Sequence, residues 1–167
     1  MKLKTLQIYF LVVILTLNYI IKPAFSGEIK LTKLVALKSP WSFSFIDNNN
    51  LLISEKFGKI KLLDLNNNKI KEIKHNLNFS SEGQGGLLDI LYKDNTVWIS
   101  YSEKRGNSKT STSIASGKFN NNKIIFNNIF QANPPIDSGY HFGSRLAIKE
   151  DYLFASVGER GKGMIAQ

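Results

Sequence analysis

The sequence predicts an all-β fold, most specifically a β-propeller, in which similar sheets surround a central channel. Three observations support this prediction. Past Gly27 the apolar residues fall in short runs of branched and aromatic side chains, which Asn, Asp, Gly or Ser separate. No stretch after Gly27 carries the apolar stripe of an amphipathic helix. A unit of two strands also recurs along the chain.

The first 26 residues have the pattern of a signal peptide. Lysines precede an apolar run over residues 8–21, and Ala24 and Ser26 place small residues where a signal peptidase reads them. The run is shorter than the about 20 apolar residues that span a bilayer. We therefore expect cleavage of residues 1–26 and a periplasmic or secreted domain over residues 27–167, without stable membrane insertion. An uncleaved N-terminal anchor is the alternative.

Ten strands are expected in the remaining chain, each bounded by turn-forming residues. They cover residues 41–46, 51–55, 59–65, 69–73, 87–92, 97–101, 112–119, 123–130, 145–148 and 153–157. Three runs of consecutive Asn indicate turns between strands, because Asn tolerates the left-handed backbone conformation.

The repeated unit is an apolar strand, an acidic or Asn-rich turn, and a second apolar strand that ends in serine. Its three copies end in Ser54, Ser100 and Ser156, at spacings of 46 and 56 residues. Propeller blades repeat every ~40–50 residues and take insertions in their loops, so the domain would supply about three blades. A β-sandwich, which is also built from hairpins, is the alternative.

Charge and composition limit the classes of function. The formal net charge is +9, but the lysines alternate with Ile or Leu along strand segments instead of forming a block with interleaved aromatics. This alternation is typical of the solvent-facing side of a strand, so we expect no nucleic-acid partner. The absence of cysteine excludes disulfides and thiolate metal sites.

The first candidate functional loop covers residues 81–89, where three glycines flank Gln84 immediately before an apolar strand. Glycine lets the backbone turn sharply and approach a ligand closely, and the glutamine amide both donates and accepts hydrogen bonds. The loop lacks the lysine of a phosphate-binding loop and leads into a strand instead of a helix. A tight turn between blades is the structural alternative.

The second candidate loop covers residues 134–145 and contains His141 between two aromatic residues. A neutral imidazole at the mouth of a strand is a suitable general base, since its ordinary pKa is about 6.5. A purely structural histidine is the alternative. His75 lacks this setting and is expected to be exposed. The two histidines do not have zinc-ligand spacing, and the sequence lacks the Gly-x-Ser-x-Gly elbow of serine hydrolases.

Taken in order, several motifs resemble those of the glucose/sorbosone dehydrogenase family, especially its soluble aldose sugar dehydrogenase branch. These motifs lie at residues 40–42, 51–55, 83–89, 100–102, 141–146, 158–160 and 166–167. His-Phe-Gly-Ser-Arg together with Gly-Gln-Gly-Gly is specific in combination, and the resemblance covers nearly all of the chain after the signal peptide.

The resemblance implies a six-bladed propeller that oxidises the anomeric carbon of aldose sugars to lactones with pyrroloquinoline quinone (PQQ) and calcium. His141 matches the family's general base, which takes a proton while hydride passes to the quinone. Gln84 and Gln167 match residues of the sugar pocket. The electron acceptor that reoxidises the quinone is not implied.

Two local departures concern the surroundings of the histidine. Glu159 stands where the family usually has Asp, and Tyr140 stands where some members carry an acid. The second departure leaves open what orients His141. Arg145, beside the loop, is expected to support it instead of contacting sugar.

The family's quinone contacts and calcium ligands are expected beyond residue 167, because about six blades of ~45 residues need ~270 residues. We therefore expect an N-terminal portion of a longer enzyme that is inactive alone. A non-catalytic propeller that binds carbohydrate or protein is the alternative, since one fold hosts many functions. A lactonase-type propeller would need acidic or Asn metal ligands, for which the loops offer few candidates.

Overall fold

The computed structural model describes residues 29–165, so the expected signal peptide lies outside the described residues. The chain divides into two units, Met1–Lys33 and Leu34–Gln167, and every strand belongs to the second. Within residues 29–165, no helix has the length and apolar character needed to cross a membrane.

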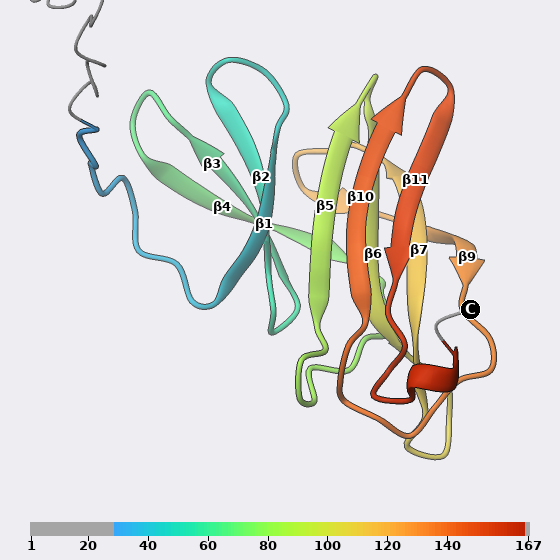
Figure 1. The fold of residues 1–167 in the computed structure, drawn as a ribbon. Coiled ribbons are helices and arrows are strands. Elements are labelled where there is room, and N and C mark those ends of the chain that lie inside the picture. Colours follow the sequence, from blue (N-terminus) through green and yellow to red (C-terminus); the bar gives the residue numbers. More distant parts are fainter. Residues whose placement is uncertain (1–28, 166–167) are drawn as a thin grey trace, which may run out of the picture. The chain divides into compact units, whose positions relative to one another are not determined.

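The described residues form eleven strands and one 3-10 helix, which confirms the all-β prediction (Figure 1). The elements are β1 (Pro40–Phe45), β2 (Asn50–Glu55), β3 (Lys59–Asp64), β4 (Lys69–His75), β5 (Leu87–Lys93), β6 (Thr96–Lys104), β7 (Thr110–Lys118), β8 (Lys123–Ile124), β9 (Asn127–Gln131), β10 (Gly143–Lys149), β11 (Tyr152–Val157) and η1 (Gly163–Ile165).

The strands form three sheets, and each sheet begins with one copy of the sequence repeat. The first sheet has the order β1-β2-β3-β4 with β8 added in parallel, the second has β5-β6-β7-β9, and the third contains β10 and β11. Strand β5 contacts β1 on one side and β10 on the other. The described residues therefore hold two four-stranded antiparallel blades, the first extended by β8, and the opening hairpin of a third.

Two of the three serines that mark the repeat join neighbouring sheets. Ser54 is fully buried and donates to the carbonyl oxygen of Leu88 on the next sheet (2.5 Å). Ser100 is also buried and donates to the carbonyl oxygen of Ser144, again one sheet further on (2.6 Å). Ser156 accepts a backbone hydrogen bond within its own hairpin (2.9 Å). The first two serines of the repeat thus occupy equivalent places, each donating to the next sheet.

A buried carboxylate connects the first strands of all three sheets. Asp89 lies on β5 and is 5% exposed. It accepts hydrogen bonds from the Ser42 hydroxyl on β1 and from the backbone N–H of Leu146 on β10 (2.7 Å for the latter). Because each buried charge needs compensating partners, this residue fixes the three strands relative to one another.

The main hydrophobic core lies between the first and second sheets. In β6 every second residue from Val97 to Tyr101 belongs to it, as expected when one face of a strand packs inward. The residues of this core are Leu52, Ile60, Ile73, Leu87, Ile90, Val97, Ile99, Tyr101, Ala115, Ile124 and Phe126.

One predicted strand is wrong. Residues 123–130 were expected to form a single strand, but β8 pairs with β4 of the first sheet and β9 pairs with β7 of the second. The chain crosses between the sheets at Phe126, whose backbone N–H donates to Asn76 Oδ1 (2.8 Å) and whose carbonyl accepts from Asn76 Nδ2 (3.0 Å). The Asn76 side chain thus satisfies the backbone groups of Phe126, which a continuous strand would have paired with a neighbouring strand.

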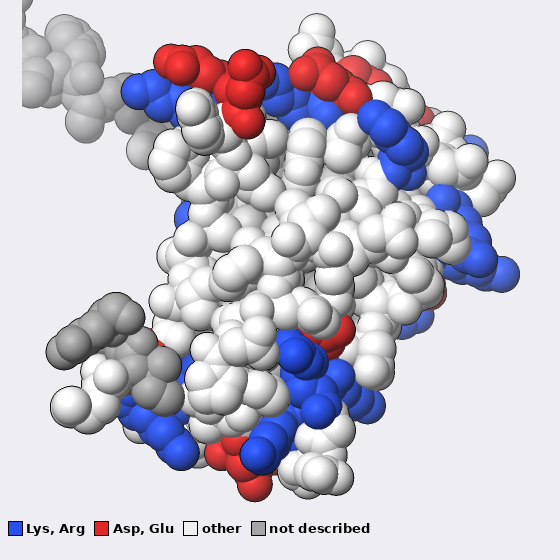
Figure 2. Space-filling model, turned by 90° about the vertical axis from the view of Figure 1, so that its right-hand side faces the viewer, with Lys and Arg blue, Asp and Glu red and all other residues white. Residues whose placement is uncertain are grey.

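Charged side chains are mixed in sign on the face shown in Figure 2. Lys and Arg lie beside Asp and Glu at its borders, and a broad uncharged surface lies between them. On this face the positive charge forms no continuous stripe of the kind that follows a phosphate backbone.

Candidate functional site

The two loops selected from the sequence lie in direct contact. Gln84 is on the connection between β4 and β5, and His141 is on the connection between β9 and β10. The backbone N–H of His141 donates to Gln84 Oε1 (2.9 Å), and the backbone N–H of Gln84 donates to the carbonyl oxygen of Gly139 (2.7 Å). Two residues 57 positions apart therefore belong to one site.

Glycine at position 83 permits this close approach of the loops. Gly83 has a φ of +54°, and a Cβ atom there would lie 2.5 Å from the carbonyl oxygen of Gly139. That neighbour is backbone, so it has no rotamer through which to move away. A side chain at position 83 would thus separate the loops and break the contact between Gln84 and His141.

The Gln84 loop is anchored by β6 and by the residue that follows β2. Ser102 of β6, fully buried, accepts a hydrogen bond from the backbone N–H of Gly86 (2.7 Å) and donates to the carbonyl oxygen of Ser80. Lys56, just after β2, donates its ammonium to the carbonyl oxygen of Gly83 (2.5 Å). The loop therefore has fixed partners on both sides of Gln84, as a ligand-binding segment requires.

His141 is held in a left-handed backbone conformation with its ring against a carboxylate. Its φ is +46°, which is uncommon for a residue other than glycine and persists where surrounding contacts enforce it. Nδ1 contacts Glu159 Oε1, and the second oxygen of that carboxylate accepts the backbone N–H of Lys162 (2.7 Å). Glu159, which follows β11, is therefore the group that orients His141.

The chemistry of the pair follows from this contact. The hydrogen bond with His141 lowers the pKa of the Glu159 carboxyl, so Glu159 is ionised and acts as an acceptor. An ionised carboxylate only accepts, so Nδ1 is the donor in this contact and Nε2 is the ring nitrogen left for another partner. The histidine side chain is 54% exposed, so solvent or a substrate can reach it.

The segment after β11 also fixes the backbone of the histidine loop. The backbone N–H of Gly158 donates to the carbonyl of Phe142 (3.0 Å), and that of Arg160 donates to the carbonyl of His141 (3.2 Å). The Arg160 side chain is buried beneath the same loop. Sequence reasoning assigned no role to Arg160, although the residue lies in a motif that carried the family resemblance.

Arg145 and His75 lie in surroundings that differ from those expected. Arg145 does not support the loop: its side chain is 81% exposed and its guanidinium lies 3.5 Å from Asp89 Oδ2. His75 is half-buried instead of exposed, because Nε2 lies 2.9 Å from the Gly58 carbonyl oxygen and Nδ1 accepts the N–H of Leu77 (3.2 Å). The third candidate, Gln167, lies outside the described residues.

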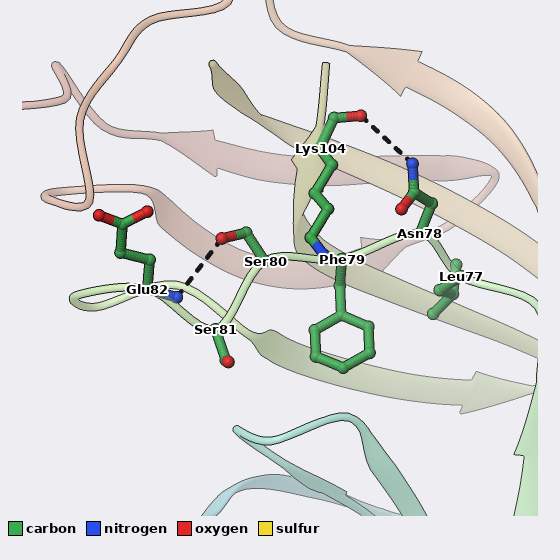
Figure 3. Close-up of a pocket in the computed structure, with 7 residues that line it drawn as sticks. All are labelled: Leu77, Asn78, Phe79, Ser80, Ser81, Glu82 and Lys104. Atoms are coloured by element: carbon green, nitrogen blue, oxygen red, sulfur yellow. Dashed lines mark hydrogen bonds between the residues drawn. The ribbon is translucent and has the colours of Figure 1, made fainter. Parts of the chain in front are cut away.

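A pocket of about 650 Å³ lies beside the first loop, lined by residues 77–82 and Lys104 (Figure 3). Neither Gln84 nor His141 lines it, so this pocket is separate from the candidate site. In the described part of the chain, no group of three or more His, Asp or Glu side chains is arranged to hold a metal ion.

Comparison with known proteins relates the chain to sugar dehydrogenases. The family model described as glucose / sorbosone dehydrogenase matches residues 37–167. The chain is 29% identical over 141 residues to aldose sugar dehydrogenase YliI of Escherichia coli (strain K12), which covers 78% of the chain and 38% of that relative.

Solved structures share the fold. A glucose dehydrogenase crystal structure matches with a TM-score of 0.70 and 30% identity over 75% of the chain and 40% of its own. The apo-form of the soluble aldose sugar dehydrogenase from Escherichia coli matches with a TM-score of 0.70 and 28% identity, over 75% and 39%. A PQQ-bound aldose sugar dehydrogenase from Streptomyces coelicolor has the same fold, with a TM-score of 0.65, 24% identity and coverage of 76% and 40%. The chain spans about two fifths of the length of these proteins.

Proposed function

Because the chain belongs to the glucose/sorbosone dehydrogenase family, we propose that it supplies the proton acceptor and part of the sugar pocket of an enzyme that oxidises aldoses to lactones. The observation that carries the proposal is the arrangement of Gln84, His141 and Glu159 around one loop contact. Each of the three comes from a different loop, and together they form a general base with its orienting carboxylate and a neighbouring amide.

In this function His141 Nε2 accepts the proton of the anomeric hydroxyl group while the anomeric C–H bond gives up a hydride. Loss of that proton and that hydride converts the cyclic sugar into its lactone. The imidazolium that forms is stabilised by Glu159, whose carboxylate contacts the opposite ring nitrogen. Proton transfer to a positioned base contributes about 10²–10⁴-fold to rate.

Gln84 is proposed to bind the sugar through its amide NH₂ group. Its Oε1 atom already accepts the N–H of His141 (2.9 Å), so the oxygen is used to hold the general base. The nitrogen donates two hydrogen bonds, which suit a ring oxygen or hydroxyl oxygen of an aldose. Gln84 thereby couples the position of the sugar to that of His141.

PQQ is proposed as the hydride acceptor, with calcium, on the basis of the family resemblance. The residues described here do not fit either group. Lys56 and Arg160 are cations that contact the two loops, but both donate to backbone carbonyls. The described residues form no metal-ligand group. We assign no residue of this chain to the quinone or to calcium.

We further propose that residues 1–26 direct export to the periplasm or outside the cell, and that residues 27–167 are the N-terminal part of a six-bladed propeller. A separate electron acceptor then reoxidises the cofactor. The 167-residue chain alone is expected to be inactive, because the general base would act without a bound hydride acceptor.

The test is dye-coupled oxidation of an aldose by the full-length protein, supplied with PQQ and calcium. Wild-type protein should reduce the dye, and His141→Ala should lower the rate at least about 100-fold. His75→Gln, the other histidine, serves as the matched control and should retain the rate. Absence of dye reduction, or activity unaffected by His141→Ala, would refute the proposal, and sugar binding without dye reduction would favour a non-catalytic propeller.

A further inference from the structure

Arg160 is a buried cation directly beneath the histidine loop. Its exposed fraction is 4%, whereas the side chain of Arg145 is 81% exposed. Arginine is almost never buried to this degree unless paired. Its position immediately after Glu159 places it in the segment that orients His141.

The guanidinium contacts three alternate residues of the histidine loop. Nε donates to the carbonyl oxygen of Tyr140 (2.9 Å), and Nη2 donates to the carbonyl oxygen of Ser138. The ring of Phe142 lies under the guanidinium carbon, with 3.8 Å between that carbon and the ring centroid. One side chain thus holds the backbone before His141 and the ring after it.

The same guanidinium ties this loop to the second sheet. Nη1 donates to the carbonyl oxygen of Thr110 (2.9 Å), and Nη2 donates to the hydroxyl of Thr110 (2.7 Å). Thr110 begins β7, a strand with nine paired residues against β6. A backbone bridge between Thr110 and Ile136 joins the start of the loop to this strand, and Arg160 extends the connection to the residues next to His141.

The acceptors around Arg160 are neutral. Within residues 29–165, no carboxylate forms an ion pair with its guanidinium. Burial lowers the pKa of this group, which nevertheless remains protonated near neutral pH. Burying a charge without an opposite charge is unfavourable, and an apolar side chain would fill the space at lower cost. An apolar residue could not, however, supply the planar set of N–H donors that the guanidinium presents to these carbonyl and hydroxyl oxygens.

We propose that Arg160 is a positioning residue for proton transfer, which acts by fixing the backbone on both sides of His141. Its side chain holds Ser138 and Tyr140, and its backbone N–H holds the carbonyl of His141 (3.2 Å). This arrangement enforces the left-handed conformation that directs the ring to Glu159. The inference rests on the proposed function for its catalytic consequence but concerns geometry that can be measured separately.

The test compares Arg160→Met, Arg160→Lys and the matched control Arg145→Met in the full-length enzyme. Displacement of a reacting group by about 1 Å costs about 100-fold in rate. We expect kcat to fall about 100-fold in Arg160→Met. In Arg160→Lys, which keeps the charge but loses the planar guanidinium, kcat should fall about 10-fold. KM for the sugar should change less than about threefold, because Arg160 touches no sugar-binding group. Arg145→Met should retain kcat.

A substrate deuterated at the anomeric carbon provides a second readout. The isotope effect on kcat should rise in Arg160→Met, because the chemical step becomes slower than the steps around it. If Arg160 had a purely structural role, its replacement would reduce the amount of folded enzyme. The isotope effect, and both kcat and KM of the enzyme that remains folded, would then be unchanged. Thr110→Val, which removes one acceptor, keeps the inference testable if Arg160→Met does not fold.

Hydrogen exchange separates this inference from the proposed function. The backbone amide of His141 should exchange at least about tenfold faster in Arg160→Lys than in wild type, whereas amides of β6 should be unaffected. Inactive wild-type enzyme would refute the proposed function alone. Unchanged exchange at His141, or unchanged kcat in all Arg160 variants of an active enzyme, would refute the role of Arg160.

Discussion

Replacing Gly158 with alanine should displace the proton acceptor without altering any polar group. A Cβ atom at this position would lie 2.6 Å from the carbonyl carbon of His141, closer still to its oxygen, and 2.8 Å from the backbone nitrogen of Gly143. Carbon atoms in contact lie about 3.5–4.0 Å apart, so the main chain at His141 must move by about 1 Å. Every atom in the way belongs to the backbone, so no side chain can rotate to make room.

A displacement of this size should lower kcat about 100-fold. Stopped-flow or steady-state dye reduction by the full-length enzyme measures the rate, and a melting curve verifies that the variant is folded. Gly163→Ala is the matched control, because nothing lies within 4 Å of a Cβ atom there. If Gly158→Ala retained wild-type kcat while folded, the position of His141 would not limit the reaction and the reasoning would fail.

Three further predictions concern other charged groups. Glu159→Gln removes the charge that stabilises the imidazolium, so kcat should fall more than about 10-fold at nearly constant KM; equal kcat would contradict the orienting role. Hydrogen bonds from two lysines lower the pKa of Glu72 from 4.5 to about 2, so its stabilisation is present above pH 4.5 and is lost as pH falls toward 2. The urea midpoints of wild type and Glu72→Gln should therefore differ slightly at pH 7 and converge over that window; a constant difference would contradict this. Asp89→Ala leaves the Ser42 hydroxyl and the Leu146 N–H without their acceptor. The unfolding free energy measured in urea titrations should therefore fall by about 3 kcal/mol. A loss below about 1 kcal/mol would show that the three strands do not depend on Asp89.

The strands and the repeat were predictable because their signals are local. Alternating apolar residues and Asn-rich turns identified nearly every strand, and the recurring serines marked the first hairpin of each sheet. The crossing near Phe126 was missed because its hydrogen-bond partner is Asn76, a side chain 50 positions away. No local pattern in the sequence reports such a partner.

The site was predictable as separate residues but not as an arrangement. Gln84 and His141 stood out by their glycine-rich and aromatic surroundings, yet their mutual hydrogen bond depends on how two sheets pack. The orienting carboxylate, Glu159, was noted only as a departure from the family pattern. Arg160 sits between a glutamate and a glycine, a setting typical of an exposed turn, so its burial could not be inferred from composition. Arg145 was expected to have the supporting role because it lies at the end of the loop, where the strand begins.

The central claim is that His141 accepts the proton of the anomeric hydroxyl group. A crystal structure of the full-length enzyme with an aldose bound tests it most directly. The account predicts the anomeric oxygen within about 3 Å of His141 Nε2, with Glu159 on Nδ1 and the Gln84 amide nitrogen on a sugar oxygen. A sugar whose anomeric oxygen contacts a different base, with His141 turned away from it, would contradict the account.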